Sequence, residues 1–315
     1  MNVEMRKLIY TVLLGCAVAM VAPAHAAEGW LTDLPEAMRK AEEEKKLVLI
    51  DFTGSDWCSA CIHLRRNVLD NRDFRAYADE HFVLMEVDLP RCKSFDPTLR
   101  AKNEAIAARY NVAAYPTIMV LTPQGRVLGG FQEGDKTVKE AIAALDNACT
   151  VDALFRKASM QSGVERAKTL YEAYLLYPSS KGFAVFNEAL RNEIMGCDPE
   201  NVTGIHDAAA VIEQARLFLN QRERLAFNSP ELGQLLEQQL REALPANRTS
   251  VMLARCQYAM TTAETVEDIV STRKMFEELI PLLPEGQAAE IRHYTDTFFR
   301  DPAELLRMLK ASRPR

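Results

Sequence analysis

The 315-residue sequence contains seven cysteines, but only Cys58 and Cys61 lie close together. A structural zinc site needs four ligands, which close pairs of cysteine or histidine commonly supply. No second close pair is present, and His63 alone does not complete a ligand set around the first. The sequence therefore argues against zinc, and we expect no metal site.

Basic runs are also missing. The formal net charge is -6, and it becomes -7 without residues 1–26, because Arg6, Lys7 and Glu4 are removed with them. Nucleic acids and anionic membrane surfaces attract clustered lysine and arginine side chains. We therefore expect this acidic chain to bind neither.

The N-terminus has the pattern of a secretory signal peptide. Residues 1–7 carry Arg6 and Lys7, residues 8–22 are apolar, and Pro23-Ala-His-Ala26 follows. This pattern predicts cleavage after Ala26, and the apolar run is short for a transmembrane anchor. A lipoprotein signal modified at Cys16 is an alternative, although the apolar run continues past Cys16.

Export sets the redox environment of the remaining cysteines. We expect a periplasmic or secreted mature chain, residues 27–315, with no membrane span once the signal is removed. Its 289 residues are enough for two hydrophobic cores. Disulfides form and persist outside the cytosol, so the expected partners are exported cysteine-containing proteins or a redox partner protein.

The segment around Cys58 and Cys61 carries the main chemical signal. An apolar run over 47–50 predicts a buried strand, and apolar positions over 62–69 recur with helical spacing. The first thiol of the pair then lies where unpaired N–H groups and the helix dipole favour an anion. We predict Cys58 as the low-pKa nucleophile and Cys61 as the resolving thiol.

Two motifs resemble the thioredoxin-like superfamily over residues 30–149. They are Trp57-Cys-Ser-Ala-Cys61, after a strand and before a helix, and Tyr115-Pro-Thr117 before a later strand. The resemblance implies a cis peptide at Pro116 beside the thiols, with Tyr115 lining the substrate groove. Two departures stand out: the dipeptide between the cysteines is Ser-Ala, and Asp51 precedes Cys58 by seven positions. The resemblance assigns Asp51 as the proton acceptor for Cys61. It assigns Trp57 as a supporting residue; the alternative is that Trp57 is only a core aromatic.

The order of elements predicts a thioredoxin-like α/β domain over 27–149, with a mixed central sheet and helices on both faces. Strands are expected over 47–52, 82–88, 117–121 and 126–131, the last two as a β-hairpin. Helices are expected over 34–46, 62–69, 73–81, 99–110 and 136–149.

Strand-like runs stop near residue 150, and helical periodicity continues to the end. Nine candidate helices, starting with 151–160, are separated by Gly or Pro. We predict an all-helical domain over 150–315. Paired helices of this length resemble tetratricopeptide-like stacking, although no strict period is present. It can be a packing domain without a site or a protein-docking surface.

Two functions fit these features. The first is an exported thiol–disulfide oxidoreductase that needs no soluble cofactor, with the direction of reaction left open. The second is a non-catalytic binding or assembly protein, in which Cys58–Cys61 is a structural disulfide and the helical domain docks proteins. Reactivity of the thiols separates them.

Four cysteines lie outside the motif in the mature chain. Cys92 is in the loop after the second strand, and we expect Cys149 to be bridged to Cys197 or Cys256, which would join the two domains. The alternative is that these are buried free thiols that pack as small apolar side chains.

Overall fold

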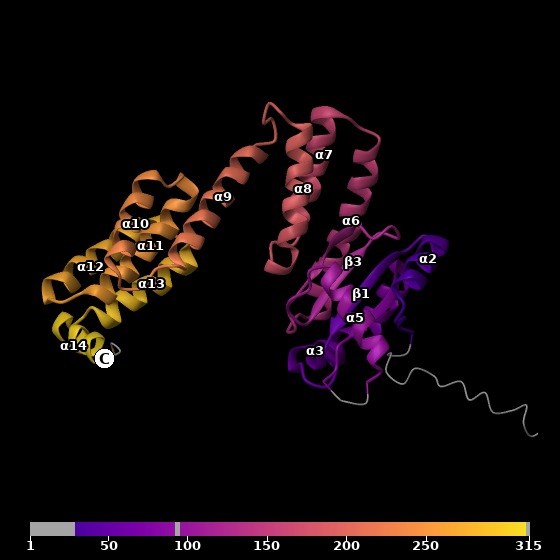
Figure 1. Ribbon diagram of the computed structural model, residues 1–315, viewed down its shortest axis with the longest axis horizontal. Helices are drawn as coiled ribbons and strands as arrows, with labels where there is room; N and C mark the ends of the chain where they lie inside the picture. The colour runs from indigo at the N-terminus through magenta and orange to yellow at the C-terminus, as the bar shows by residue number, and fades with distance from the viewer. Residues whose placement is uncertain (1–28, 92–94, 313–315) are drawn as a thin grey trace, which may run out of the picture. The chain divides into compact units, whose positions relative to one another are not determined.

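The computed structural model describes residues 29–91 and 95–312 (Figure 1). The predicted signal peptide, Cys16 and Cys92 lie outside the described residues. The elements of the first half, in order, are α2 (Leu34–Glu44), β1 (Leu47–Thr53), α3 (Ser59–Leu64), the π-helical turn η1 (Arg65–Leu69), α4 (Arg72–His81), β2 (Phe82–Asp88), α5 (Pro97–Arg109), β3 (Thr117–Leu121), β4 (Val127–Phe131) and α6 (Val138–Ser159).

The elements that follow are helical. They are α7 (Gly163–Leu176), the 3₁₀ turn η2 (Lys181–Phe183), α8 (Ala184–Cys197), α9 (Ile205–Arg222), α10 (Pro230–Glu242), α11 (Pro245–Thr262), α12 (Val266–Leu279), the 3₁₀ turn η3 (Ile280–Leu282), α13 (Glu285–Phe298) and α14 (Pro302–Ser312).

A four-stranded mixed sheet forms the centre of the N-terminal half. The strand order is β2-β1-β3-β4, with β1 parallel to β2 and antiparallel to β3. β3 and β4 pair antiparallel, which confirms the predicted β-hairpin. Every residue of the four strands is buried, so the sheet is covered on both faces.

Neighbouring residues of β1 show which helices cover each face. Successive side chains of a strand point to opposite faces. Asp51 contacts Arg65 of η1, whereas the ring of Phe52 packs edge-on against Tyr110, which follows α5. The sheet therefore lies between η1 on one face and the end of α5 on the other, as the predicted fold class requires.

Local sequence sets where several helices begin. Asp33 caps α2 by accepting a hydrogen bond from the Glu36 N–H, and Pro35 occupies the first turn. Thr137 and Glu140 form a capping box at the start of α6. These caps set where α2 and α6 begin, and both helices contact strands of the sheet.

The two helices predicted over 136–149 and 151–160 are a single helix, α6, and the prediction was wrong here. Its buried positions include Leu145, Ala148, Val151 and Phe155, which recur every three or four residues. No glycine or proline interrupts this face, so one apolar stripe continues through residue 150.

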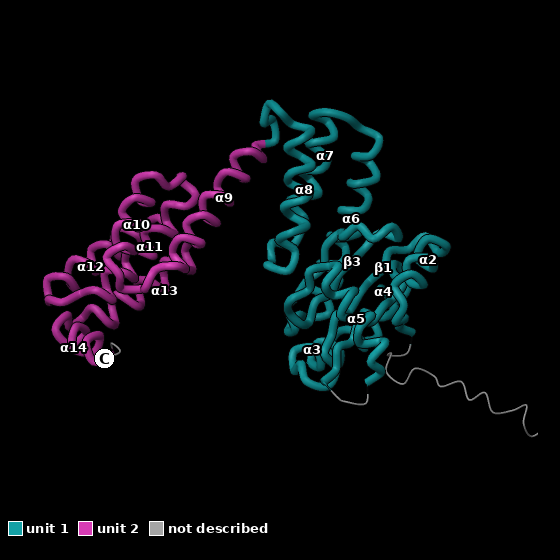
Figure 2. The backbone as a smooth tube through the Cα atoms, in the orientation of Figure 1, with its two compact units in different colours: residues 1–203 teal, residues 204–315 magenta. Residues whose placement is uncertain are grey.

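The chain divides into two compact units, residues 1–203 and 204–315 (Figure 2). The boundary predicted near residue 150 lies inside α6. Helices α6, α7 and α8 pack in sequence and belong to the first unit together with the sheet.

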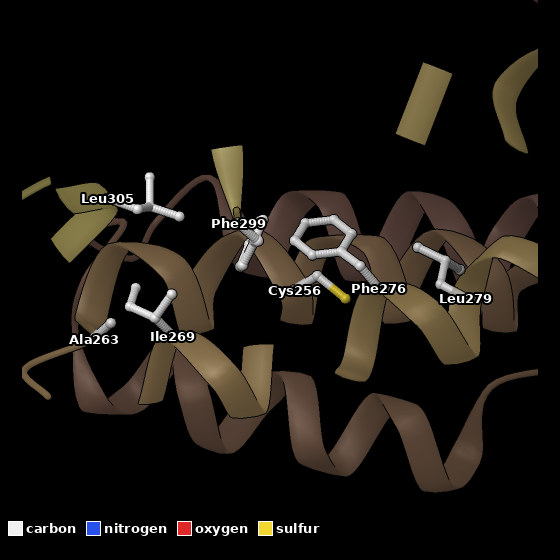
Figure 3. Close-up of a cluster of buried hydrophobic side chains, with 7 residues drawn as sticks. All are labelled: Cys256, Ala263, Ile269, Phe276, Leu279, Phe299 and Leu305. Carbon is white, nitrogen blue, oxygen red and sulfur yellow. The ribbon is translucent and has the colours of Figure 1, made fainter. Parts of the chain in front are cut away.

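The described part of the second unit contains only helices and turns, so the C-terminal region is largely helical. Its main core is a cluster of buried side chains (Figure 3): Cys256, Ala263, Ile269, Phe276, Leu279, Phe299 and Leu305. Tetratricopeptide-like stacking stays a prediction. Across the described residues of both units, no helix is long and apolar enough to cross a membrane.

The predicted disulfide between Cys149 and Cys197 or Cys256 is wrong, because all three are free thiols. Cys256 is 1% exposed and is enclosed by the apolar cluster of the second unit. Cys149 is half-buried near Tyr77 in the first unit, and burial raises the pKa of its thiol. Burial likewise raises the pKa of Cys256 to about 11. Each thiol is thus packed within its own unit.

Candidate functional site

Cys58 and Cys61 are joined by a disulfide at the start of α3. Cys58 is the N-cap of this helix, and its Sγ accepts a hydrogen bond from the Cys61 N–H at 3.2 Å. The Cys58 side chain therefore occupies the position where a helix favours negative charge. Cys58 is 7% exposed and Cys61 is 3% exposed, so Cys58 is the more accessible of the pair.

The loop before Cys58 is hydrogen-bonded to residues at the end of β2. Asp88 accepts two hydrogen bonds from Ser55, from its N–H at 2.9 Å and from its hydroxyl at 2.6 Å. The indole N–H of Trp57 donates to the Leu89 carbonyl at 2.9 Å. A Cβ at Gly54 would lie 2.4 Å from the indole ring, so only glycine leaves room for Trp57 in this position. The Arg91 guanidinium lies 4.2 Å from the centre of the same indole ring.

The second motif meets the first at Trp57. The Tyr115–Pro116 peptide is cis, which confirms the expectation for Pro116. The Tyr115 ring packs edge-on against Trp57, with centroids 5.8 Å apart. Pro116 itself is buried. Trp57 is therefore part of the site's surface rather than a fully buried core aromatic.

A buried charge cluster joins β1 and β2 to η1, the turn that follows α3. Arg65 Nη2 is 2.6 Å from Asp51 Oδ2 and 2.5 Å from Glu86 Oε1, and its guanidinium stacks over Trp30 at 4.5 Å. Asp51 and Glu86 lie opposite each other in the β1–β2 register. Arg65 is four residues after Cys61 and its N–H donates to the Cys61 carbonyl, so the cluster begins one turn beyond the disulfide.

Two buried carboxylates share one guanidinium here. Burial raises the pKa of Asp51 to about 6, although Arg65 opposes this rise; Asp88 and Asp70 add to it through like charge. Asp51 is 2% exposed, and its Oδ1 has no hydrogen-bond partner among the described residues. Asp51 is therefore a carboxyl group that can exchange a proton near neutral pH.

Of the predicted site residues, Cys58 and Cys61 are bonded to each other, and Trp57, the residue before Cys58, contacts Tyr115. Asp51 lies on β1 with Arg65 as its charged partner. His63 is exposed and lies beside Asn67 on the helix surface. No group of three or more metal-ligating side chains occurs in the described part of the chain.

Sequence reasoning missed Arg65, Glu86 and Asp88. A signal for Glu86 was present, because an acidic residue interrupts the apolar run of β2. Charged residues are almost never buried without a partner, so a buried Glu86 indicates that a cationic side chain lies nearby. Arg65, one helical turn after Cys61, is the residue that supplies it.

The comparisons with known proteins agree with this geometry. A family model described as thioredoxin-like matches residues 29–123. The disulfide bond reductase DsbH of Chlamydia pneumoniae is 31% identical over 114 residues, which are 36% of this chain and 69% of that protein. The thioredoxin-related protein DsbJ of the same organism is 25% identical over 164 residues. That match covers 50% of this chain and about half, 47%, of DsbJ.

Among solved structures, one described as DsbH oxidoreductase is 24% identical, covers 44% of this chain and 96% of its own, and has a TM-score of 0.36. A thioredoxin from Thermus thermophilus is 22% identical, with coverage of 38% and 85% and a TM-score of 0.32. The matched family region contains the disulfide, the cis proline and three of the four strands of the sheet, β1, β2 and β3. This chain carries a thioredoxin-like domain homologous to DsbH and DsbJ, and it belongs to the thioredoxin-like family.

Proposed function

We propose that this protein is an exported thiol–disulfide oxidoreductase that reduces disulfides in other exported proteins. The observation that carries the proposal is the Cys58–Cys61 disulfide at the start of α3, where the preceding residue Trp57 packs against Tyr115. The name of DsbH, a disulfide bond reductase, favours reduction as the direction for this chain also.

Reduction begins from the dithiol. The Cys58 thiolate attacks one sulfur of the substrate disulfide, forms a mixed disulfide and releases the other substrate sulfur as a thiolate. Cys61 then loses its proton and attacks Cys58 Sγ, which releases the second substrate sulfur. The two electrons come from the enzyme dithiol, which ends as the Cys58–Cys61 disulfide, and a dithiol partner restores it.

The site supports this division of roles. Cys58 is the more exposed sulfur and caps the helix, where the N–H groups stabilise a thiolate. Asp51 is the proposed acceptor of the Cys61 proton. It is buried and pairs with Arg65, which lies one helical turn after Cys61, and its Oδ1 has no hydrogen-bond partner among the described residues. Trp57 and Tyr115 provide aromatic surface next to the sulfurs.

Export belongs to the proposal as well. Cleavage after Ala26 would release a periplasmic or secreted protein that meets cysteine-containing substrates and a redox partner there. No metal or soluble cofactor has a place in this scheme.

The decisive experiment measures insulin reduction by the purified mature protein, with dithiothreitol as the electron donor. We expect Cys58→Ser to abolish the activity and Cys61→Ser to accumulate mixed disulfides with the substrate. Cys149→Ser is the matched control, because this half-buried thiol lies outside the motif. Full activity in Cys58→Ser would refute the assignment of the nucleophile.

The low exposure of the disulfide favours a second candidate, a binding protein in which Cys58–Cys61 is structural. Alkylation after mild reduction separates the two. Rapid labelling of one thiol at neutral pH supports the oxidoreductase, whereas a disulfide that resists dithiothreitol in the folded protein supports the structural role.

A further inference from the structure

The helical hairpin, defined as α7, η2 and α8, covers the free edge of the sheet. β4 is an edge strand, and edge strands in native proteins are often shielded by other elements. The hydroxyl of Tyr177, which ends α7, donates to the Val127 carbonyl of β4. Arg126, just before β4, pairs with Glu193 of α8 at 2.8 Å. The helical hairpin therefore contacts β4 and the residue before it through a hydrogen bond and an ion pair.

A chain of three hydrogen bonds continues from the helical hairpin into the sheet. The Gly182 N–H of η2 donates to Gln132 Oε1 at 3.0 Å, and Gln132 Nε2 donates to Thr117 Oγ1 at 3.0 Å. The Thr117 hydroxyl donates its own hydrogen to the Ala114 carbonyl at 2.8 Å. The Gly182 N–H can only donate, and the Thr117 hydroxyl uses its hydrogen for Ala114. These partners therefore fix the orientation of the Gln132 amide, with its oxygen toward Gly182 and its nitrogen toward Thr117.

This chain ends at the cis peptide. Ala114 and Thr117 flank Tyr115–Pro116, and their hydrogen bond closes the loop around it. The Tyr115 ring in turn contacts Trp57, the residue before Cys58.

The segment that carries Gln132 also reaches the cysteine helix. A Cβ at Gly134, two residues further on, would lie 2.8 Å from the Cβ of Ala60, which stands between the two cysteines. One short segment after β4 thus touches the loop of the cis proline and the start of α3.

We propose that Gln132 is a positioning residue of the redox site, and that the helical hairpin holds it in place through Gly182. The inference rests on the proposed function, because it concerns how the same site accepts protein disulfides. With Gln132 fixed on both sides, the Tyr115–Pro116 loop keeps one position relative to Trp57 and Cys58. The helical hairpin then contributes to substrate binding through Gln132.

The test uses one variant on each side of the contact. Gln132→Ala removes the link, and Gly182→Ala displaces it from the hairpin side, because the added Cβ would lie 2.1 Å from Gln132 Nε2. Losing one hydrogen bond corresponds to a factor of about five in an equilibrium constant. We expect each variant to raise KM for insulin about fivefold, with kcat unchanged. Reduction of a small-molecule disulfide such as hydroxyethyl disulfide should be unaffected.

Three further variants separate positioning from a general loss of structure. The Gln132→Ala/Gly182→Ala double variant should show no larger effect than either single variant, because both break the same link. Thr117→Ser keeps the hydroxyl and should retain the normal KM, whereas Thr117→Val should raise it. Gln124→Ala is the control, since Gln124, in the turn between β3 and β4, makes an exposed hydrogen bond to Glu42 of α2 that is not part of this chain of hydrogen bonds. Unchanged KM values in both Gln132→Ala and Gly182→Ala would overturn the proposal.

A spectroscopic measurement keeps this test independent of activity. The chain has two tryptophans, so Trp30→Phe leaves Trp57 as the only indole reporter. In that background, Gly182→Ala should change the emission of Trp57, because the Tyr115 ring beside it shifts. A changed emission supports the inference even if the protein reduces no insulin. An unchanged emission, in a protein that does reduce insulin, rejects it.

Discussion

The two units differ in what they bury. The first unit encloses charged side chains, among them Asp51, Glu86 and Asp88 around the cysteine helix. In the described part of the second unit, no charged side chain is buried, and its buried polar residues are Thr272 and Thr295. Each of these hydroxyls donates to a carbonyl of its own helix, three or four residues back.

Buried charge is expensive and persists where it is paired or serves chemistry. In the first unit, the cluster of Asp51, Arg65 and Glu86 begins one helical turn beyond the only disulfide among the described residues. The second unit is built as an ordinary apolar helix core, with Phe276 packed edge-on against Tyr294 and Phe299. From this difference we expect the chemistry of the proposed function to lie in the first unit and apolar packing to stabilise the second.

The largest stability effect should come from opening the core of the second unit. Phe276 is 3% exposed, and truncating a buried phenylalanine costs about 3–5 kcal/mol. We expect Phe276→Ala to lower the free energy of unfolding of the second unit by about that amount, while insulin reduction at 25 °C changes little. Urea unfolding followed by circular dichroism, with the activity assay in parallel, checks both parts. A matched loss of activity in the still-folded variant would contradict the separation of roles.

A pH-dependent effect should mark the first unit. The pKa of Asp51 is about 6 in the folded protein, against about 3.9 in an unfolded chain. The folded state therefore holds more protons between these values, and stability falls as pH rises from about 4 through about 6. Asp51→Asn removes this pH-dependent contribution to the free energy of unfolding, and Arg65 keeps Glu86 as a partner.

We therefore expect the stability of Asp51→Asn, relative to the parent protein, to rise by roughly 3 kcal/mol between pH 4 and pH 7. Urea unfolding at several pH values measures it. Asp70→Asn is the control, because Asp70 is exposed and affects Asp51 only through space. A constant difference across this pH range would show that Asp51 titrates normally.

The smallest effect should be at a buried polar residue of the second unit. Thr272 is 1% exposed, and its hydroxyl donates to the Asp268 carbonyl of the same helix. Thr272→Val keeps the shape and removes only this local bond, so the free energy of unfolding should change by less than about 1 kcal/mol. Thr117→Val in the first unit, where the hydroxyl links Gln132 to Ala114, is the informative comparison. If Thr272→Val and Thr117→Val changed stability and KM equally, buried polar groups would have the same role in both units, which would contradict the comparison.

Much of this organisation follows from local sequence signals. The apolar run before the cysteine pair, the alternation in β2 and the turn between β3 and β4 predicted the strands correctly. The Cys-x-x-Cys spacing led to the disulfide, and the family resemblance that the Tyr-Pro-Thr motif carries implied the cis peptide. These features are readable because each depends on residues within a few positions of one another.

Other features depended on contacts between distant segments. Asp51, Arg65 and Glu86 come from three elements, and Gln132 meets Gly182 fifty residues away. The pairing predicted for Cys149 failed for the same reason, since its surroundings are set by Tyr77 and not by its place in the chain.

The sequence by itself determined most helices and strands and the Cys58–Cys61 pair, because periodicity, caps and the Cys-x-x-Cys spacing act over one or two helical turns. Only the tertiary structure decided which side chains share the buried charge, where α6 continues and what holds the Tyr115–Pro116 loop. Those outcomes depend on which faces are desolvated together, and burial is a property of the packed chain.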